Sequence, residues 1–461
     1  MPDRTNERGP DPELKPARVA VIGAGPSGFF TAGALLGLRD LDVSVDLFDR
    51  LPTPWGLVRS GVAPDHPKIK SVSAVFEKTA AHERFRFFGN VDIGRDMTRD
   101  ELLARYDAVV YGTGAQTDKT LGVPGEELPG TMAASAFVGW YNGHPDHHAL
   151  HVDLSSERAV IVGNGNVALD IARILVTPPD RLANTDIADR ALHALATSRV
   201  REVVVVGRRG PAQGTFTTPE LEELAALTGA KVLIDPEPTV AEALAELPDD
   251  AEPRVRRNLE VLQGYVSSTP DGEDDPHQRR LVLRFLSSPV ELQGSVRVER
   301  VVLGANELID DAGAVRAVDT GRRAIVEAGL VVTAVGYTAT PVDRLPIGHD
   351  GSVPNQEGRV SGHEREYVVG WAKRGPSGVI GMNKKCAVDT VRAVADDLRL
   401  GARIEAGDDV ESWLRARQPD LVTGVGWAAI DASERDAGSA SGRPRVKHCT
   451  YDALLAAASA T

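Results

Sequence analysis

A strand, a glycine-rich turn and a helix near the start of the chain constrain the fold more than any other feature. The sequence RVAVIGAGPSG begins at Arg18. Its apolar run Val19 to Ile22 predicts a buried parallel strand, and Pro26 to about Leu38 predicts an apolar helix. Three glycines keep the G-x-G-x-x-G spacing that lets a pyrophosphate approach the backbone and a helix pack closely on its strand: Gly23, Gly25 and Gly28. The stretch therefore predicts dinucleotide binding rather than a turn used only for packing.

The next predicted strand, Val43 to Phe48, ends at Asp49, whose carboxylate can accept hydrogen bonds from a pair of ribose hydroxyls. A second strand–turn–helix pattern follows farther along, with a strand at Val160 to Val162 and a helix reaching about Val176. Gly163, Gly165 and Ala168 occupy its three glycine positions, and alanine is an accepted variant at the third. The chain therefore carries two nucleotide-binding patterns.

The end of the second pattern indicates which nucleotide it binds. The strand Glu202 to Gly207 runs into Arg208 and Arg209, where a carboxylate would suit the free 2′-hydroxyl of NAD. Two guanidinium groups instead offer forked donors for a 2′-phosphate dianion. This favours NADP over NAD, the alternative being an arginine pair that lies only on the surface.

Composition excludes several classes of function. The formal net charge of −14 argues against general nucleic-acid binding, and no apolar run approaches the ~20 residues of a membrane span. The only two cysteines, Cys386 and Cys449, lack metal-ligand spacing, which argues against a zinc site and an internal iron–sulfur cluster. Four histidines between His144 and His151 favour a solvated loop, so no metal site is expected. A reducing cytoplasm fits these features best.

The predicted fold class is α/β, with two three-layer Rossmann-like domains and the NADP domain inserted into a discontinuous FAD domain. We expect a disordered leader at 1–17, the FAD domain at 18–116 and 334–461, and the NADP domain at 117–333. A buried strand ending in glycine near 109–114 is expected to bring the chain toward the cofactor and out of the first domain. A similar strand at 330–337 is expected to return the chain to that domain. Other expectations are an ordered loop without helix at 51–70, strands at 85–88, 91–93, 296–303, 313–318 and 367–371, and helices at 70–83, 386–398, 410–417 and 451–460.

Two different dinucleotides in one chain predict hydride transfer from NADPH to FAD. A disulfide reductase would need a cysteine pair beside the flavin, and the sequence has no such pair. The electrons are therefore expected to pass to a separate acceptor.

The chain resembles the NADPH–ferredoxin reductases of the adrenodoxin reductase type, particularly those of actinobacteria. The resemblance covers about residues 18 to 450. It is carried by the motifs GAGPSG, PWGLVRSGVAPDHPKIKS, FRFFGNV, GNGNVALDIARIL, VGRRGP with the later Glu220, and EYVVGWAKRGPSGVIG followed by NKK.

The resemblance implies ferredoxin as the partner and assigns site residues. FAD would be held by Ser27, Asp49, Leu57, Val91, Trp371, Gly378, Val379 and Ile380. NADP would be held by Asn164, Gly165, Asn166, Val167, Arg208, Arg209, Glu220 and Gly378. In the family His66 and Glu220 lie near the nicotinamide end, and we take them as positioning or tuning groups, the alternative being loop structure and helix capping. Asp49 stands where many relatives carry Glu, so its ribose contact is expected to be longer or water-bridged.

Three alternative functions are also considered. An NADPH diaphorase or quinone reductase would use the same half-reaction with a small acceptor. A non-catalytic flavoprotein and a flavin monooxygenase are less favoured, because both nucleotide motifs are intact and no substrate pocket is apparent. For ferredoxin docking we expect a basic face near the flavin edge, built from Arg59, Lys68, Lys70, Lys373, Arg374, Lys384 and Lys385.

Overall fold

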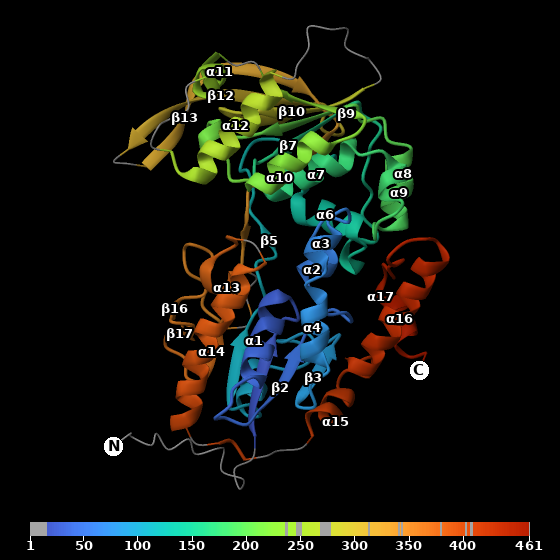
Figure 1. The fold of residues 1–461 in the computed structure, drawn as a ribbon, viewed down its shortest axis with the longest axis vertical. Coiled ribbons are helices and arrows are strands. Elements are labelled where there is room, and N and C mark those ends of the chain that lie inside the picture. The colour runs from blue at the N-terminus through green and yellow to red at the C-terminus, as the bar shows by residue number, and fades with distance from the viewer. Residues whose placement is uncertain are drawn as a thin grey trace, which may run out of the picture. The chain divides into compact units, whose positions relative to one another are not determined.

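The computed structural model describes residues 16–235, 238–245, 251–267, 278–311, 314–339, 342, 344–378, 380–401, 403–405 and 409–460. The chain divides into two compact units (Figure 1). The first comprises the residues up to Val62, His66–Thr117 and the chain from Tyr337 onward, and the second comprises Ala63–Asp65 and Asp118–Gly336. Among the described residues, none of the helices combines the length and apolar character that crossing a bilayer requires. The predicted leader lies almost wholly outside the described residues.

The first unit is built on an eight-stranded sheet with the order β16-β17-β18-β4-β1-β2-β3-β19. Its five central strands are parallel: β18 (Glu366–Val368), β4 (Ala108–Tyr111), β1 (Ala17–Ile22), β2 (Val43–Phe48) and β3 (Phe85–Gly89). The short edge strands are β16 (Asn355–Gln356), β17 (Arg359–Val360) and β19 (Val422–Thr423). Parallel strands need long crossovers, and these place helices on the faces of the sheet.

Alternating side chains of β1 enter two different cores. Val19 and Val21 pack beneath α1 (Pro26–Leu36) and α14 (Met382–Leu400), which contact each other along one face of the sheet (Figure 1). Ala20 and Ile22 enter the core on the opposite face. Burial on both faces explains why Val19 to Ile22 of β1 is a continuous apolar run in the sequence.

The second unit contains a six-stranded parallel sheet with the order β6-β14-β7-β8-β10-β9. Its strands are β6 (Thr131–Ala133), β14 (Leu330–Thr333), β7 (Arg158–Val162), β8 (Glu202–Val206), β10 (Arg279–Arg284) and β9 (Ala230–Ile234). An antiparallel sheet of β11 (Ser287–Gln293), β12 (Arg300–Asp311) and β13 (Ala314–Glu327) shares a core with β7 and β8. The helix α7 (Asn166–Val176) follows β7 directly.

The remaining elements are shorter or peripheral. In the first unit they are α2 (Leu57–Ser60), α3 (Pro67–Lys70), α4 (Ser73–Ala80), α5 (Arg99–Leu103), α13 (Trp371–Arg374), α15 (Val410–Arg415), α16 (Gly424–Ala440) and α17 (Tyr451–Ala458). In the second they are α6 (Ala134–Asn142), α8 (Pro179–Leu182), α9 (Asp189–Ala196), α10 (Thr218–Glu223), α11 (Pro238–Ala245) and α12 (Pro253–Ser267). The pair β5 (Thr117–Asp118) and β15 (Tyr337–Thr338) forms where the chain passes between the units.

The α/β class with two Rossmann-like parallel sheets is confirmed, but several local predictions are wrong. The proline-rich stretch 51–70 contains the short helices α2 and α3, and α3 begins at Pro67 because proline is tolerated in the first turn of a helix. Residues 91–93 form only an isolated bridge between Ile93 and Met97. The strand expected to reach Trp371 ends at Val368, and the predicted strands within 296–318 are a longer hairpin of β12 and β13.

Candidate functional site

The turn between β1 and α1 admits only glycine at two positions. Gly23 has φ +101°, and a Cβ there would lie 2.6 Å from the carbonyl oxygen of Gly112. A Cβ on Gly28 would lie 1.9 Å from the Gly23 oxygen. At Gly25, the N-cap of α1, the nearest atom to such a Cβ is the Gly56 Cα at 3.9 Å. The turn thus exposes backbone N–H groups at a helix N-terminus, which is the arrangement that binds phosphate.

Asp49 follows β2 directly and turns its carboxylate toward this glycine turn. Its Oδ2 accepts a hydrogen bond from the Ala24 N–H at 2.7 Å, and its Oδ1 accepts one from the Leu51 N–H at 2.9 Å. Burial raises the pKa of Asp49, and the two backbone donors oppose that change. Each carboxylate oxygen keeps a further lone pair for a ribose hydroxyl.

A buried donor lies where α13 begins. Ser27 of α1 is buried against Gly370, where φ is +68° and a Cβ would lie 2.0 Å from the Ser27 Oγ. The next residue, Trp371, has a buried indole Nε1 with no hydrogen-bond partner among the described residues. Its ring stacks on Tyr337 with centroids 6.3 Å apart. Because buried polar groups are almost always hydrogen-bonded, this donor fits a ligand that brings an acceptor.

The other residues assigned to FAD also lie in the first unit. Leu57 begins α2 and is 45% exposed, whereas Val91 is buried. Gly378 has φ +83°, and Ile380 packs against the core beneath α1. Val379 lies outside the described residues.

The turn after β7 repeats the geometry in the second unit. Gly163 has φ +130°, and a Cβ there would lie 2.2 Å from the Ala334 oxygen. Gly165 is the N-cap of α7. The Asn166 Oδ1 accepts a hydrogen bond from the Thr217 N–H at 2.8 Å, which ties the start of α7 to the segment before α10. Asn164, Gly165, Asn166 and Val167 are all half-buried, so their backbone remains accessible to a ligand.

Arg208 and Arg209 follow β8, the neighbour of β7 in the parallel sheet. The carboxyl ends of parallel strands meet at one edge, so the arginines lie at the same edge as the glycine turn. Arg208 is exposed and Arg209 half-buried, and neither side chain forms a hydrogen bond or ion pair with another described residue. Their main-chain oxygens are held, by Asn306 at 2.9 Å for Arg208 and by Leu286 at 3.1 Å for Arg209. The backbone is fixed while both guanidinium groups stay available for an anion.

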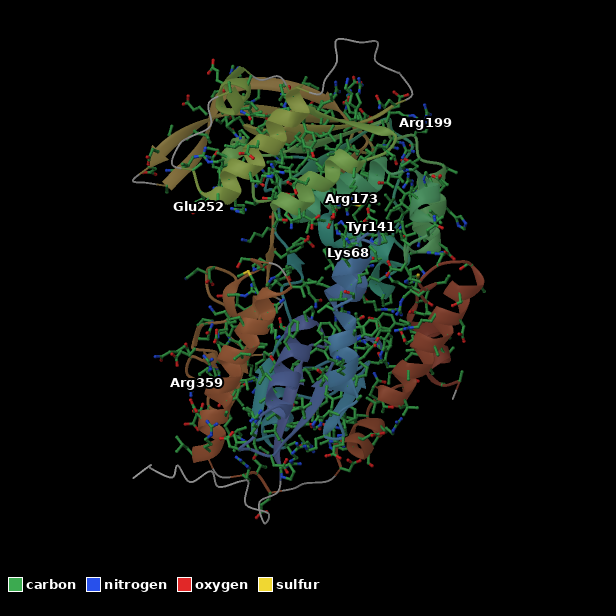
Figure 2. The ribbon with its side chains drawn as sticks, in the orientation of Figure 1. Lys68, Tyr141, Arg173, Arg199, Glu252 and Arg359 are labelled. Carbon is green, nitrogen blue, oxygen red and sulfur yellow. The ribbon has the colours of Figure 1, made fainter. Side chains whose placement is uncertain are left out.

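Glu220 lies in the first turn of α10 and is buried close to Arg173. Figure 2 labels Arg173, which belongs to α7. The Arg173 guanidinium is 2.8 Å from Asp65 and from Asp170, and 3.7 Å from Glu220. Burial lowers the pKa of Arg173, but Asp65, Asp170 and Glu223 raise it overall. Arg173 was not among the predicted site residues; the signal was an arginine among the apolar residues of the buried face of α7.

His66 belongs to the first unit and is buried at the N-cap of α3. Its carbonyl oxygen accepts the backbone N–H of Ile69 at 3.2 Å and of Lys70 at 3.3 Å. Since His66 and Glu220 belong to different units, their joint role at the nicotinamide stays a prediction.

The expected basic face needs one correction. Arg59 is buried and bonded to Glu434, so it cannot contribute to a docking surface. Lys68, Lys384 and Lys385 are exposed, whereas the Lys373 ammonium donates to Thr390 at 3.1 Å. The remaining exposed cations are therefore fewer than the sequence suggested.

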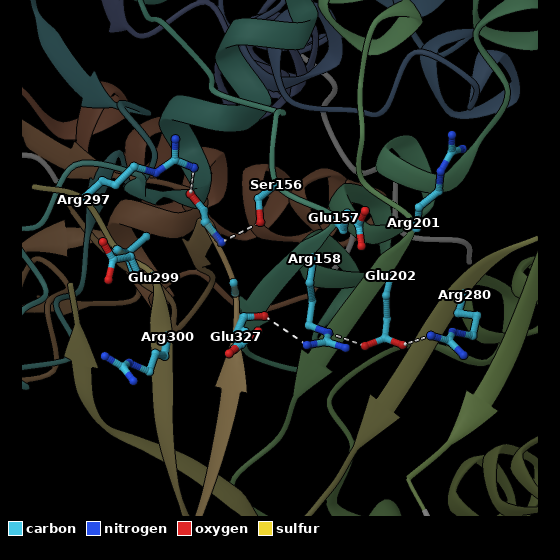
Figure 3. Close-up of a pocket in the computed structure, with 13 residues that line it drawn as sticks. Ser156, Glu157, Arg158, Arg201, Glu202, Arg280, Arg297, Glu299, Arg300 and Glu327 are labelled. Atoms are coloured by element: carbon cyan, nitrogen blue, oxygen red, sulfur yellow. Dashed lines mark hydrogen bonds and ion pairs between the residues drawn. The ribbon is translucent and has the colours of Figure 1, made fainter. Parts of the chain in front are cut away.

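A cavity of about 620 Å³ in the second unit lies at the opposite ends of the strands (Figure 3). Its lining includes Arg158 and Glu202 at the start of β7 and β8, and Arg280 near the start of β10. Glu202 pairs with both arginines, at 2.9 Å for Arg280. Charges of both signs alternate along the lining, and the cavity lies at the strand ends remote from the Gly163–Gly165 turn.

No protein-family model matches the chain, whereas individual proteins match over nearly all of it. The chain is 52% identical over 457 residues to NADPH-ferredoxin reductase FprA of Mycobacterium tuberculosis, covering 96% of this chain and 99% of that protein. It is 42% identical over 459 residues to the mitochondrial NADPH:adrenodoxin oxidoreductase of Salvelinus fontinalis, covering 96% of this chain and 91% of that protein.

A solved structure of a relative has the same fold. The structure of M. tuberculosis FprA in complex with NADPH superimposes with a TM-score of 0.91 at 52% identity, covering 96% of this chain and all of that one.

Proposed function

Because the chain belongs to the NADPH–ferredoxin reductase family, we propose that it moves electrons from NADPH through FAD to a ferredoxin. FAD is bound by the first unit and NADP by the second. The overall reaction oxidises one NADPH to NADP⁺ and H⁺ while two ferredoxins each gain one electron.

The residues of the first unit fit FAD. The Gly23–Gly28 turn supports pyrophosphate binding, and Asp49 supports a ribose contact. The buried Trp371 Nε1 supports a hydrogen bond to an acceptor on the ligand. Ser27, Leu57, Val91, Gly378, Val379 and Ile380 complete the proposed FAD set.

The single observation that carries the function is the contrast between the ends of two equivalent strands. The carboxylate of Asp49 directly follows β2, while two guanidinium groups, Arg208 and Arg209, follow β8 after Gly207. A carboxylate suits a ribose diol and repels a phosphate, and paired arginines bind a 2′-phosphate dianion. One chain that binds both kinds of nucleotide is suited to hydride transfer between them.

In the proposed mechanism the protein binds FAD and NADPH and orients them, and FAD, when bound, supplies the chemistry of accepting a hydride and releasing its electrons singly. The Asn164–Val167 turn holds the NADP pyrophosphate at the N-terminus of α7. Arg208 and Arg209 hold the 2′-phosphate. His66 and Glu220 position the nicotinamide end, and the Arg173 guanidinium lies 3.7 Å from the Glu220 carboxylate.

We further propose a cytoplasmic location, since Cys386 and Cys449 carry thiols rather than a disulfide.

The test is an anaerobic titration of the purified protein with NADPH, followed by rapid mixing with ferredoxins from the same organism. We expect bleaching of the flavin by NADPH and faster reoxidation by a ferredoxin than by quinones. Protein that binds no flavin would contradict the proposal, and preference for quinones would favour the diaphorase alternative.

A further inference from the structure

The turn formed by Trp55, Gly56 and Leu57 holds a strained backbone. Trp55 has φ +83°, a left-handed conformation that is rare for a bulky residue, and Gly56 follows with φ +49°. Such strain persists only where the surroundings fix it, and it clusters at functional sites.

This strained turn lies against the glycine-rich turn of the first unit. The Trp55 N–H donates to the Ala24 oxygen at 2.7 Å. A Cβ on Gly56 would lie 2.8 Å from the Gly25 Cα, so the two turns are in direct backbone contact. Leu57, a proposed FAD contact, is the next residue along the chain. The position of the Trp55–Leu57 turn therefore sets one wall of the proposed FAD site.

A buried carboxylate from near the C-terminus anchors the helix that follows this turn. Glu434 of α16 is fully buried, and its Oε2 accepts from the Arg59 Nη1 at 2.8 Å while its Oε1 accepts from the Nη2 at 2.5 Å. The same carboxylate accepts from Arg445 at 3.0 Å and from the His448 N–H at 2.9 Å. Arg59 belongs to α2, which begins at Leu57, so this bidentate bond fixes α2.

Neighbouring residues of the same segment hold the turn itself. The Trp427 ring meets the Trp55 ring edge-on, with centroids 4.9 Å apart. The Arg445 guanidinium lies over the Trp55 ring at 5.4 Å from its centroid. The Lys447 ammonium donates to the Arg59 main-chain oxygen at 3.1 Å. Aromatic, cationic and hydrogen-bonding contacts from one segment thus converge on the strained turn and on α2.

We propose that Trp427, Glu434, Arg445 and Lys447 form a C-terminal clamp that holds the Trp55–Leu57 turn against the Gly23–Gly28 turn, and that Glu434 is a positioning residue for FAD. The identity of the ligand rests on the proposed function. Removing the Glu434 charge leaves the buried Arg59 cation without its carboxylate, so α2 and the turn before it would shift. The clamp would then no longer hold the wall of the site.

The test measures FAD release from the holoenzyme, followed by the rise in flavin fluorescence on dilution. For Glu434→Gln we expect release about tenfold faster, as the fixed strained turn relaxes. Glu411→Gln is the matched control, because Glu411 pairs with Arg415 at 2.9 Å on the surface of the same unit. We expect wild-type release for this control.

A purely stabilising role makes a different prediction. It would lower the melting temperatures of the FAD-loaded and FAD-free proteins equally and leave the release rate unchanged, and that result would overturn the clamp. If Glu434→Gln does not fold, Trp427→Phe keeps the ion cluster and removes part of the ring contact; faster release supports the clamp and unchanged release overturns it. Wild-type protein without flavin would contradict the proposed function and the clamp together, whereas flavin-loaded protein with unchanged release contradicts the clamp alone.

Discussion

Acid should lower the unfolding free energy of the protein by protonating Glu434, and the Glu434→Gln variant isolates this contribution. Burial raises the pKa of this carboxyl, but Arg59, Arg445 and the His448 N–H lower it overall from 4.5 to about 2. A folded-state pKa below the unfolded value stabilises the protein above about pH 4.5, and this stability is lost as the pH falls toward 2. At 1.36 kcal/mol per pKa unit, the difference corresponds to about 3 kcal/mol of unfolding free energy near neutral pH.

The assay compares urea unfolding of wild type and Glu434→Gln, with saturating FAD, across this range of pH. Glutamine cannot titrate, so the stability difference between the two proteins should shrink by about 2 kcal/mol between pH 7 and pH 3. Other acids contribute equally to both proteins and cancel. A difference that stays constant with pH would refute the assignment of this titration to Glu434.

Three other predictions follow. Gly28→Ala should yield protein without bound flavin, because the alanine Cβ would lie 1.9 Å from a carbonyl oxygen. The control Gly381→Ala should keep its flavin, because no atom lies within 4 Å of that Cβ. Flavin absorbance after purification measures the difference, and flavin-loaded Gly28→Ala protein would contradict the tight-turn argument. His66→Ala and Glu220→Ala should slow flavin reduction by NADPH in stopped flow, and unchanged rates would remove both from the mechanism. Trp371→Phe should weaken FAD binding about fivefold or more by removing a buried donor, which a binding titration measures, and unchanged affinity would exclude that hydrogen bond.

The central strands and both glycine turns could be predicted because their constraints are local. Val43–Phe48 matches β2 without change, since Val43, Val45 and Leu47 alternate along the strand and enter the core beneath α1. The positions of Asp49 after β2 and of Arg208 and Arg209 after β8 could be predicted from the same strand patterns.

Features that depend on distant parts of the chain could not be predicted. The helix α16 was missed because Gly424 and Gly426 weaken the helical pattern of its first turn. The burial of Glu434 could not be predicted from the residues around it, because its partner Arg59 lies 375 positions away in the sequence. The docking assignment of Arg59 failed for the same reason. Trp371 was expected in a strand, but Gly370, with φ +68°, ends the extended run and starts α13.

The cofactor preference tests the central claim most directly. The measurement is kcat/KM for NADPH and for NADH, in wild type and in the Arg208→Ala/Arg209→Ala double variant. Arg201→Ala is the matched control, because this exposed arginine precedes the same strand at its opposite end.

Each charge-assisted bond to the 2′-phosphate is worth about 1.5–3 kcal/mol, so the double variant should lose roughly a hundredfold or more with NADPH. Its activity with NADH should be unchanged, and the control should behave as wild type. Equal use of NADH and NADPH by the wild type, or equal losses with both in the double variant, would contradict the account.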